Sequence, residues 1–145
     1  IRSDRIPATL WRVNVFEVVE RLMEREQFAG HLDLELVEVD RDRAVLRMPY
    51  HEYLGIGRVN GGAIASLVDL AATCAFWAHP DADRDSRGAT VNFTINFLRL
   101  AITDSLTATA TVRRRGGTLC TGEVSVTNDI GDEFAVAVVT YKLQL

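Results

Sequence analysis

The sequence has few of the features that mark several common classes of protein. It contains only two cysteines in 145 residues, Cys74 and Cys120, and no Cys-x-x-Cys pair. We therefore expect both thiols to be small apolar side chains in a protein of a reducing compartment, the cytoplasm. Sixteen basic and 20 acidic residues give a net charge of −4. Such a charge argues against the basic face that nucleic-acid binding requires.

The sequence also lacks a signal peptide and a convincing membrane span. The first five residues, Ile-Arg-Ser-Asp-Arg, hold no apolar core, so we expect no secretion. They include no initiator methionine, and we expect the chain to begin inside the encoded protein. Residues 61–78 are almost continuously apolar, but they are barely long enough for a membrane helix and hold Asp69 at their centre. We interpret this run as a buried helix and predict no membrane association.

Two kinds of catalytic or binding centre are also missing. His31, His51 and His79 are dispersed, without cysteines or carboxylates at the spacing of metal ligands, so we predict no metal site. No Gly-x-Ser-x-Gly motif is present, which argues against a serine hydrolase.

The remaining pattern is that of one domain, residues 1–145, without linkers or repeats. Asn14 and Glu17 have the spacing of a capping box, and apolar residues follow at helical intervals up to Gly30. Residues 1–30 are thus expected to be an N-terminal extension with a short amphipathic helix. Apolar and β-branched patterns predict six strands, at 31–39, 43–48, 90–99, 106–112, 118–127 and 134–143. In the third of these, alternation places Val91 and Phe93 on one face and Thr90 on the other.

The long helix decides the fold class. A helix that is apolar nearly all round must be covered on most sides, and a curved antiparallel sheet can do this. The order of elements is one helix, two strands, the long helix and four strands. We therefore predict an α+β fold in which the sheet wraps around the helix of residues 61–78.

Asp69 is the first candidate for chemistry. It is the only side chain ionised at neutral pH between Gly61 and Ala78, and it forms one polar stripe with Ser66 and Thr73. A carboxylate among apolar side chains costs several kcal/mol unless it is paired or hydrogen-bonded. It is either a structural group at a solvated rim or beside an arginine, or a functional carboxylate, since such acids cluster at active sites.

Gly61 and Gly62 open the same helix. The free N–H groups and positive dipole end of a helix start can hold an oxygen that gains negative charge. Glycine leaves room for a ligand to approach the backbone closely. The alternative is a tight loop-to-helix turn without function.

Two segments carry a family resemblance. Residues 54–74 read Leu-Gly-Ile-Gly-Arg-Val-Asn-Gly-Gly-Ala-Ile-Ala-Ser-Leu-Val-Asp-Leu-Ala-Ala-Thr-Cys. This segment resembles the signature of hotdog-fold acyl-CoA thioesterases of the phenylacetate-pathway (PaaI-like) type, which is His-Gly-Gly, six residues and a helical Asp or Glu. Residues 88–99 resemble the strand that follows in that family. The resemblance implies a hotdog fold that covers about residues 14–143.

The resemblance also implies a reaction, the hydrolysis of acyl-CoA to free acid and CoA without a cofactor. Asp69 matches the general base or nucleophile. Gly61 and Gly62 match the backbone donors that polarise the thioester carbonyl, and Thr90 matches a Ser or Thr that positions the attacking water. Asn60 stands where the family usually has His, and can still offer an amide donor. No Asp precedes a histidine by five positions, as it does in hotdog hydratases.

Leu54 is a second departure, because many members have an Asn there, near the nucleophilic water. It motivates an alternative function, a non-catalytic acyl-CoA or fatty-acyl binding protein. The resemblance further implies a homodimer, doubled to a dimer of dimers. Guanidinium groups suit the phosphates of CoA, so Arg58, Arg99, Arg113 and Arg114 are candidate contacts, although a solvated charge cluster is the commoner explanation for such arginines.

Overall fold

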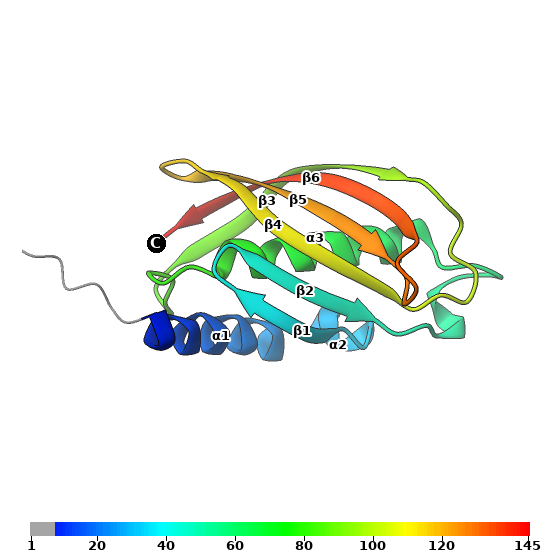
Figure 1. Ribbon diagram of the computed structural model, residues 1–145, viewed down its shortest axis with the longest axis horizontal. Helices are drawn as coiled ribbons and strands as arrows, with labels where there is room; N and C mark the ends of the chain where they lie inside the picture. The colour runs from blue at the N-terminus through cyan, green and yellow to red at the C-terminus, as the bar shows by residue number, and fades with distance from the viewer. Residues whose placement is uncertain (1–7) are drawn as a thin grey trace, which may run out of the picture.

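A curved sheet wraps around one long helix in the computed structural model, which describes the backbone of residues 8–145 and the side chains of residues 14–145 (Figure 1). The α-helices are α1 (Ala8–Arg25), α2 (Gln27–His31) and α3 (Gly61–Trp77), and a short 3-10 helix, η1, spans Glu52–Leu54. The strands are β1 (Glu35–Asp40), β2 (Arg43–Met48), β3 (Arg87–Phe97), β4 (Leu106–Arg115), β5 (Leu119–Thr127) and β6 (Glu133–Gln144). The predicted α+β class is confirmed, and the predicted order of elements differs from the structure only in lacking α2 and η1.

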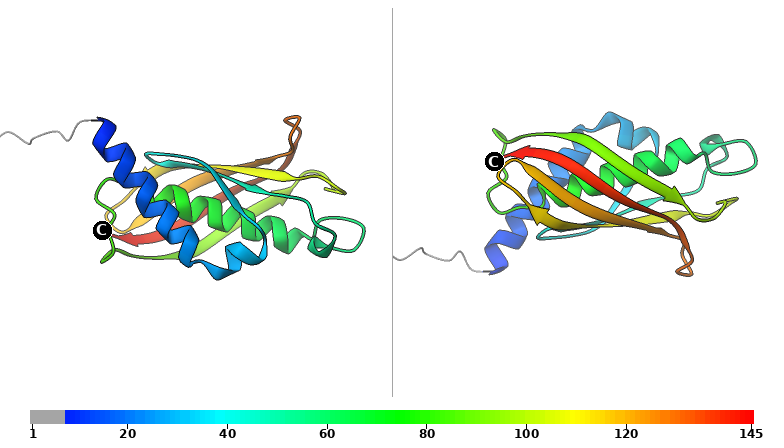
Figure 2. Two further views of the ribbon diagram at one scale, coloured as in Figure 1. Left: turned by 90° about the horizontal axis from the view of Figure 1, so that it is seen from below. Right: turned by 90° about the horizontal axis from the view of Figure 1, so that it is seen from above.

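All six strands form one antiparallel sheet in the order β1-β2-β4-β5-β6-β3. β1 and β3 are therefore the two edges. α3 lies in the concave side of this sheet, and α1 crosses the lower side of the molecule at an angle to α3 (Figure 2, left). Both edges of the sheet approach α3, which leaves the helix covered on most of its circumference.

α3 buries its apolar side chains against the sheet. Eight of its residues are buried: Ile64, Leu67, Val68, Ala71, Ala72, Cys74, Ala75 and Phe76. Five others recur every three or four positions and are only partly buried: Ser66, Asp69, Leu70, Thr73 and Trp77. We call these five residues the open stripe of α3. In residues 8–145, no helix is long and apolar enough to cross a membrane.

The N-terminal segment differs from the prediction. The helix begins at Ala8 instead of Asn14, so Asn14 is no N-cap, and its amide donates to the carbonyl oxygen of Pro80 at 3.1 Å. Gly30 does not end a helix either, because it lies within α2. The first strand consequently starts at Glu35, four residues later than predicted.

The N-terminal part of β3 contains a β-bulge that the sequence pattern does not reveal. Thr90 pairs with Tyr141 and Asn92 pairs with Thr140, so Val91 is an extra residue without a partner on β6. Thr90 and Phe93 therefore face α3 together, while the side chain of Val91 is 57% exposed. The predicted alternation, which put Thr90 on the opposite face from Phe93, is wrong at this point because a bulge resets the two-residue period.

Arg115 fixes the other end of α3. Its guanidinium is 19% exposed and donates to Asp42 Oδ1 at 2.6 Å and to the carbonyl oxygen of Phe76 at 2.8 Å. A cation at the C-terminal end of a helix favours the negative end of its dipole. Arg115 is thus both the last residue of β4 and a cap for the C-terminal end of α3.

Candidate active site

Asp69 lies near the middle of the open stripe and faces β3. The hydroxyl of Thr90 donates a hydrogen bond of 2.6 Å to Asp69 Oδ1. The extra residue Val91 lets Thr90 and Phe93, three positions apart in the sequence, both face the helix. Two residues predicted separately from a helix and a strand thus come together. One carboxylate oxygen is held by Thr90, and Oδ2 is left for another donor.

Tyr141 and Trp77 continue this polar contact toward the end of α3. The indole Nε1 of Trp77 donates to the Tyr141 hydroxyl oxygen at 2.8 Å. Burial raises the pKa of Tyr141 above its usual value of about 10, and the negative charge of Asp69 adds to this shift, against hydrogen bonds from Trp77 and Thr73 that lower it. The phenol is therefore neutral at physiological pH.

Gly88 makes room for the ring of Tyr141. A Cβ atom at Gly88 would lie 2.5 Å from Tyr141 Cε1, closer than such atoms approach in proteins. Neither Tyr141 nor Gly88 stands out in the sequence as a candidate site residue. The contact between Gly88 and Tyr141 depends on the pairing of β3 with β6, and the residue pattern of one strand does not predict which strand it pairs with.

Asn60 is the N-cap of α3. Its side-chain Oδ1 accepts a hydrogen bond of 2.7 Å from the N–H of Gly62. The Gly62 N–H is therefore already engaged, whereas the Gly61 N–H has no acceptor among the residues that the structure describes. Because Oδ1 makes the cap, the Nδ2 amide of Asn60 is the donor left over. The helix start offers two donors, Gly61 N–H and Asn60 Nδ2, instead of the predicted pair of glycine N–H groups.

Phe97 and Leu54 shape the surroundings of the helix start. A Cβ atom at Gly61 would lie 3.3 Å from the tip of the Phe97 ring, so this ring packs close to the first turn of α3. Leu54 is buried in the core, and its carbonyl oxygen accepts the Asn60 N–H at 2.8 Å. Leu54 thus fixes the loop before α3 and presents no polar side chain.

The helix start and Asp69 lie well apart along α3 of one chain. Gly62 and Asp69 are seven residues apart on α3, about 10 Å at ~1.5 Å per residue. A thioester carbon and an attacking water approach to about 3–3.5 Å. One chain therefore presents two half-sites, a donor pair at one end of α3 and a carboxylate near its middle.

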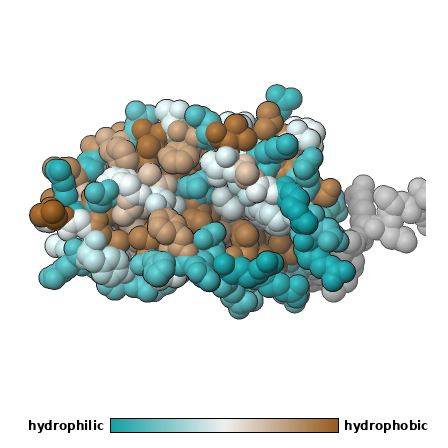
Figure 3. Space-filling model, turned by 180° about the vertical axis from the view of Figure 1, so that it is seen from behind, coloured by the Kyte–Doolittle hydropathy of each residue, from teal (hydrophilic) through white to brown (hydrophobic). Residues whose placement is uncertain are grey.

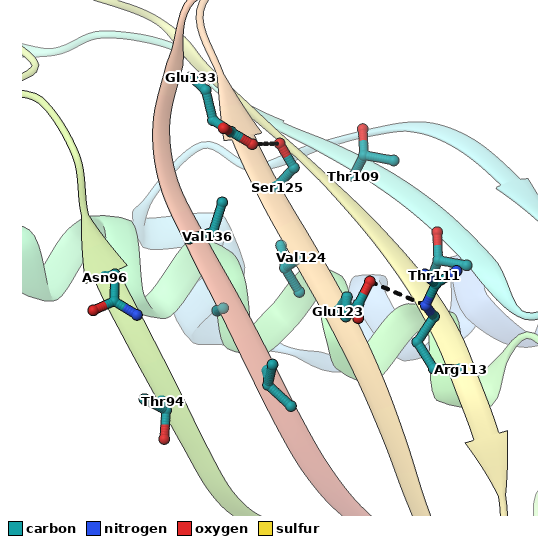
Figure 4. Close-up of a pocket in the computed structure, with 12 residues that line it drawn as sticks. Thr94, Asn96, Thr109, Thr111, Arg113, Glu123, Val124, Ser125, Glu133 and Val136 are labelled. Atoms are coloured by element: carbon teal, nitrogen blue, oxygen red, sulfur yellow. Dashed lines mark hydrogen bonds and ion pairs between the residues drawn. The ribbon is translucent and has the colours of Figure 1, made fainter.

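The four candidate CoA-binding arginines do not converge. Arg58 and Arg99 belong to neighbouring loops at the start of α3, because Val59 N–H donates to the carbonyl oxygen of Ala101 at 2.7 Å. Arg113 lies on the opposite side of the sheet from α3 and pairs with Glu123 at 3.0 Å (Figure 4). It lines a groove of about 500 Å³ on that outer face, and Arg114, its neighbour on β4, is exposed.

The described residues offer no alternative centre of metal or thiol chemistry. In residues 8–145, no three His, Cys, Asp or Glu side chains gather closely enough to hold a metal ion. Cys74 and Cys120 are both buried free thiols, and burial raises the pKa of Cys74 to about 12. A thiol with such a pKa is a poor nucleophile at neutral pH.

The fold is shared with solved thioesterase structures. The PaaI protein from the phenylacetic acid degradation operon of E. coli superposes with a TM-score of 0.82 at 23% identity, covering 91% of this chain and 94% of that one. Zebra fish thioesterase superfamily member 2 gives a TM-score of 0.75 at 25% identity, covering 92% and 98%. The predicted hotdog fold is confirmed.

Sequence comparison leads to the same family. A Halobacterium salinarum protein, whose name assigns it provisionally to the esterases, is 38% identical over 86 residues. The match covers 56% of each protein, so the chain spans about half the length of this curated relative. The family model of the Thioesterase superfamily matches residues 56–135, which is more than half of the chain. The matched segment includes all of α3 and β3. The chain belongs to the Thioesterase superfamily.

Proposed function

We propose that this protein hydrolyses acyl-CoA thioesters to the free acid and CoA, with Asp69 as general base and without metal or cofactor. The observation that carries the proposal is the hydrogen bond from Thr90 to Asp69 Oδ1 on the open stripe of a thioesterase-family helix. The bond orients the carboxylate and leaves Oδ2 to accept a proton from water. The buried free thiols support a reducing, cytoplasmic location as part of the same proposal.

The proposed reaction proceeds in two steps. Asp69 takes a proton from water as the water oxygen forms a bond to the thioester carbon, and the carbonyl oxygen becomes an oxyanion. Gly61 N–H and Asn60 Nδ2 of a helix start hold this oxyanion, since donors aimed at developing charge stabilise the transition state. The tetrahedral intermediate then collapses, the carbon–sulfur bond breaks, and the leaving CoA sulfur receives the proton from Asp69.

The distance along α3 between the two half-sites favours a site that is shared with a second copy of the chain. We infer that the helix start of one protomer lies opposite Asp69 of its partner in a homodimer, which doubles to a dimer of dimers. Apolar surface on the β3 side of the molecule supports this arrangement (Figure 3). On β3 and the segment after it, the exposed large apolar residues are Val91, Phe97, Leu98, Leu100 and Ile102. Exposed apolar side chains that gather on one side of a molecule are typical of interaction surfaces.

A thiol-release assay with aliphatic and aromatic acyl-CoAs tests the function. The wild-type protein should release free CoA thiol from at least one acyl class. Asp69→Asn keeps the side-chain volume and removes the base, so kcat should fall by about 10²–10⁴-fold. Circular dichroism and thermal unfolding control for folding. An Asp69→Asn protein with wild-type turnover would make Asp69 a structural residue and overturn the mechanism.

Leu54 favours a second candidate function, a non-catalytic acyl-CoA binding protein. Its side chain is buried and apolar, so it cannot hold a water by a hydrogen bond. Titration calorimetry with acyl-CoA, followed by recovery of the thioester, separates the two functions. Binding with the thioester recovered intact supports the second candidate, whereas recovery of free acid supports hydrolysis.

A further inference from the structure

A cavity rich in arginine lies at the far end of the open stripe. It measures about 560 Å³ and is enclosed by the last part of α1, the end of α3 and the loop that leads into β3. Its cationic lining is Arg21, Arg25, Arg84 and Arg87, and its acidic lining is Glu26 and Asp83. Four arginines and two carboxylates line the cavity, and the same segments of the chain also carry Glu17, Glu20, Glu24, Asp81 and Asp85.

The guanidinium groups of this cavity are weakly paired within the chain. Arg21 lies 3.8 Å from Glu17, and the two side chains are 72% and 52% exposed. Arg84 lies 3.9 Å from Asp85, at 92% and 81% exposure. Exposed pairs at such distances contribute little. Among the described residues, no carboxylate lies within 4 Å of the Arg25 guanidinium.

Of the two carboxylates that line the cavity, Asp83 is held by its own loop. Asp83 Oδ1 accepts hydrogen bonds from the N–H groups of Asp85 and Ser86, at 2.8 and 3.0 Å. These bonds lower the pKa of Asp83. Arg87 Nη1 is fixed in the same loop by the carbonyl oxygens of Asp85 and Ser86, at 2.9 and 3.1 Å. The loop therefore holds the Asp83 carboxylate internally and places Arg84 and Arg87 beside the cavity.

Trp77 connects the cavity to the proposed active site. Asp69, Thr73 and Trp77 follow one another at intervals of four residues on the open stripe, and Trp77 also lines the cavity. Asp69 and Trp77 are thus about 12 Å apart along α3 at ~1.5 Å per residue. A long ligand can reach Asp69 with one end while its other end occupies the cavity.

We propose that the cavity binds the phosphorylated adenosine end of CoA, an inference that rests on the proposed function. A single carboxylate is satisfied by one bidentate arginine, whereas four arginines match a ligand that carries several phosphates. Trp77, Val18 and Leu22 supply an aromatic and aliphatic wall for a purine ring. This site contains none of the four arginines that were predicted from the sequence to contact CoA, and those four do not come together in the structure.

The test measures binding without turnover. Titration calorimetry compares CoA, adenosine 3′,5′-bisphosphate, pantetheine and inorganic phosphate on three proteins of full length. These are the wild type, the double variant Arg25→Gln/Arg84→Gln, and the control double variant Arg113→Gln/Arg114→Gln, which loses the same charge from the outer side of the sheet. All four arginines are exposed or pair only on the surface, so both double variants should fold.

For CoA and adenosine 3′,5′-bisphosphate, the Kd should rise at least about tenfold in the cavity variant and stay within about twofold in the control, because each lost guanidinium removes charge-assisted hydrogen bonds. Pantetheine, which lacks phosphate, should bind all three proteins alike. Equal weakening in both double variants would indicate a general charge effect and overturn the proposal. The proposal would also be overturned if adenosine 3′,5′-bisphosphate bound the wild type no more tightly than inorganic phosphate does.

The outcome is separate from that of the hydrolysis assay. If the cavity variant loses nucleotide binding but no acyl-CoA is hydrolysed by the wild type, the cavity assignment stands and the proposed hydrolysis fails. If the wild type hydrolyses acyl-CoA and the cavity variant keeps both its Kd for CoA and its KM, the cavity assignment fails and the hydrolysis stands.

Discussion

Asn60 illustrates how one side chain serves both the fold and the proposed chemistry. Its Oδ1 caps α3 through the Gly62 N–H, and this bond turns the Nδ2 amide away from the helix. A histidine at this position, which the family signature has, can also offer an N–H donor. We infer that Asn60 keeps the donor and adds an N-cap, so its two functions can be tested separately.

Two substitutions of Asn60 separate capping from transition-state stabilisation. Asn60→Asp keeps a good N-cap, so the free energy of unfolding should stay close to that of the wild type. It replaces the Nδ2 donor with a carboxylate oxygen, and kcat should fall by about 10²–10³-fold. Asn60→Ala loses both functions and should also cost about 1 kcal/mol of stability. Urea unfolding and thiol release measure the two effects, and an Asn60→Asp protein of full activity would exclude Asn60 as an oxyanion donor.

At the level of single residues, the sequence predicts which types of group matter but not how they are arranged. Asp69 stands out because it is the one charge on an apolar helix, and Thr90 follows from the family resemblance. Their contact cannot be predicted from periodicity, since regular alternation turns Thr90 away from Phe93. The catalytic roles of both residues stay predictions.

At the level of elements, prediction succeeds where the pattern is long and uniform. β2 spans Arg43–Met48 as predicted, and the apolar run that begins at Gly61 forms α3. It fails at α1, where Asn14 and Glu17 imitate a capping box within a helix that starts at Ala8. It fails again in β3, where the extra residue Val91 changes which side chains face α3. A bulge is defined by the pairing with the neighbouring strand, so the sequence of β3 alone does not reveal it.

The bulge in β3 makes a testable prediction about register. Deleting Val91 should leave a regular ladder in which Thr90 still pairs with Tyr141 and faces Asp69, because Val91 has no partner on β6. We expect this variant to fold and to keep measurable thioesterase activity. Deleting Thr94, which pairs with Val138, should instead shift one part of the strand and turn apolar side chains to the solvent.

Thermal unfolding and thiol release compare the two deletions. The Thr94 deletion should lower the melting temperature strongly or abolish folding, and the Val91 deletion should do neither. Equal damage by both deletions would show that the bulge itself, and not only the facing of Thr90, is needed in the strand.

At the scale of the whole molecule, the sheet covers most of α3 but leaves the open stripe partly exposed. Asp69 lies in this stripe, and β3, the neighbouring edge strand, carries exposed apolar side chains such as Val91 and Phe97. An edge strand with apolar side chains invites association with another chain. The open stripe and the edge strand together leave one side of the molecule suited to a partner, which agrees with the half-sites on α3.

Mixed dimers test whether the active site is shared between two protomers. A two-fold dimer has two equal sites, each with Asp69 from one protomer and the helix start from the other. We expect Asp69→Ala and Asn60→Asp homodimers to be nearly inactive. When the two variants are co-expressed with different tags and purified as mixed dimers, one site carries both lesions and the other carries none. About half of the wild-type activity should therefore return.

A reciprocal pairing provides the control. A protomer with both Asp69→Ala and Asn60→Asp, paired with a wild-type protomer, places one lesion in each shared site, so this mixed dimer should be nearly inactive. If each site were built from a single chain, the results would be reversed. The first mixed dimer would stay inactive, and the second would keep about half of the activity because its wild-type protomer would hold a complete site. The two dimers contain the same substitutions in the same numbers, so a difference in activity reports only how the residues are distributed between the protomers.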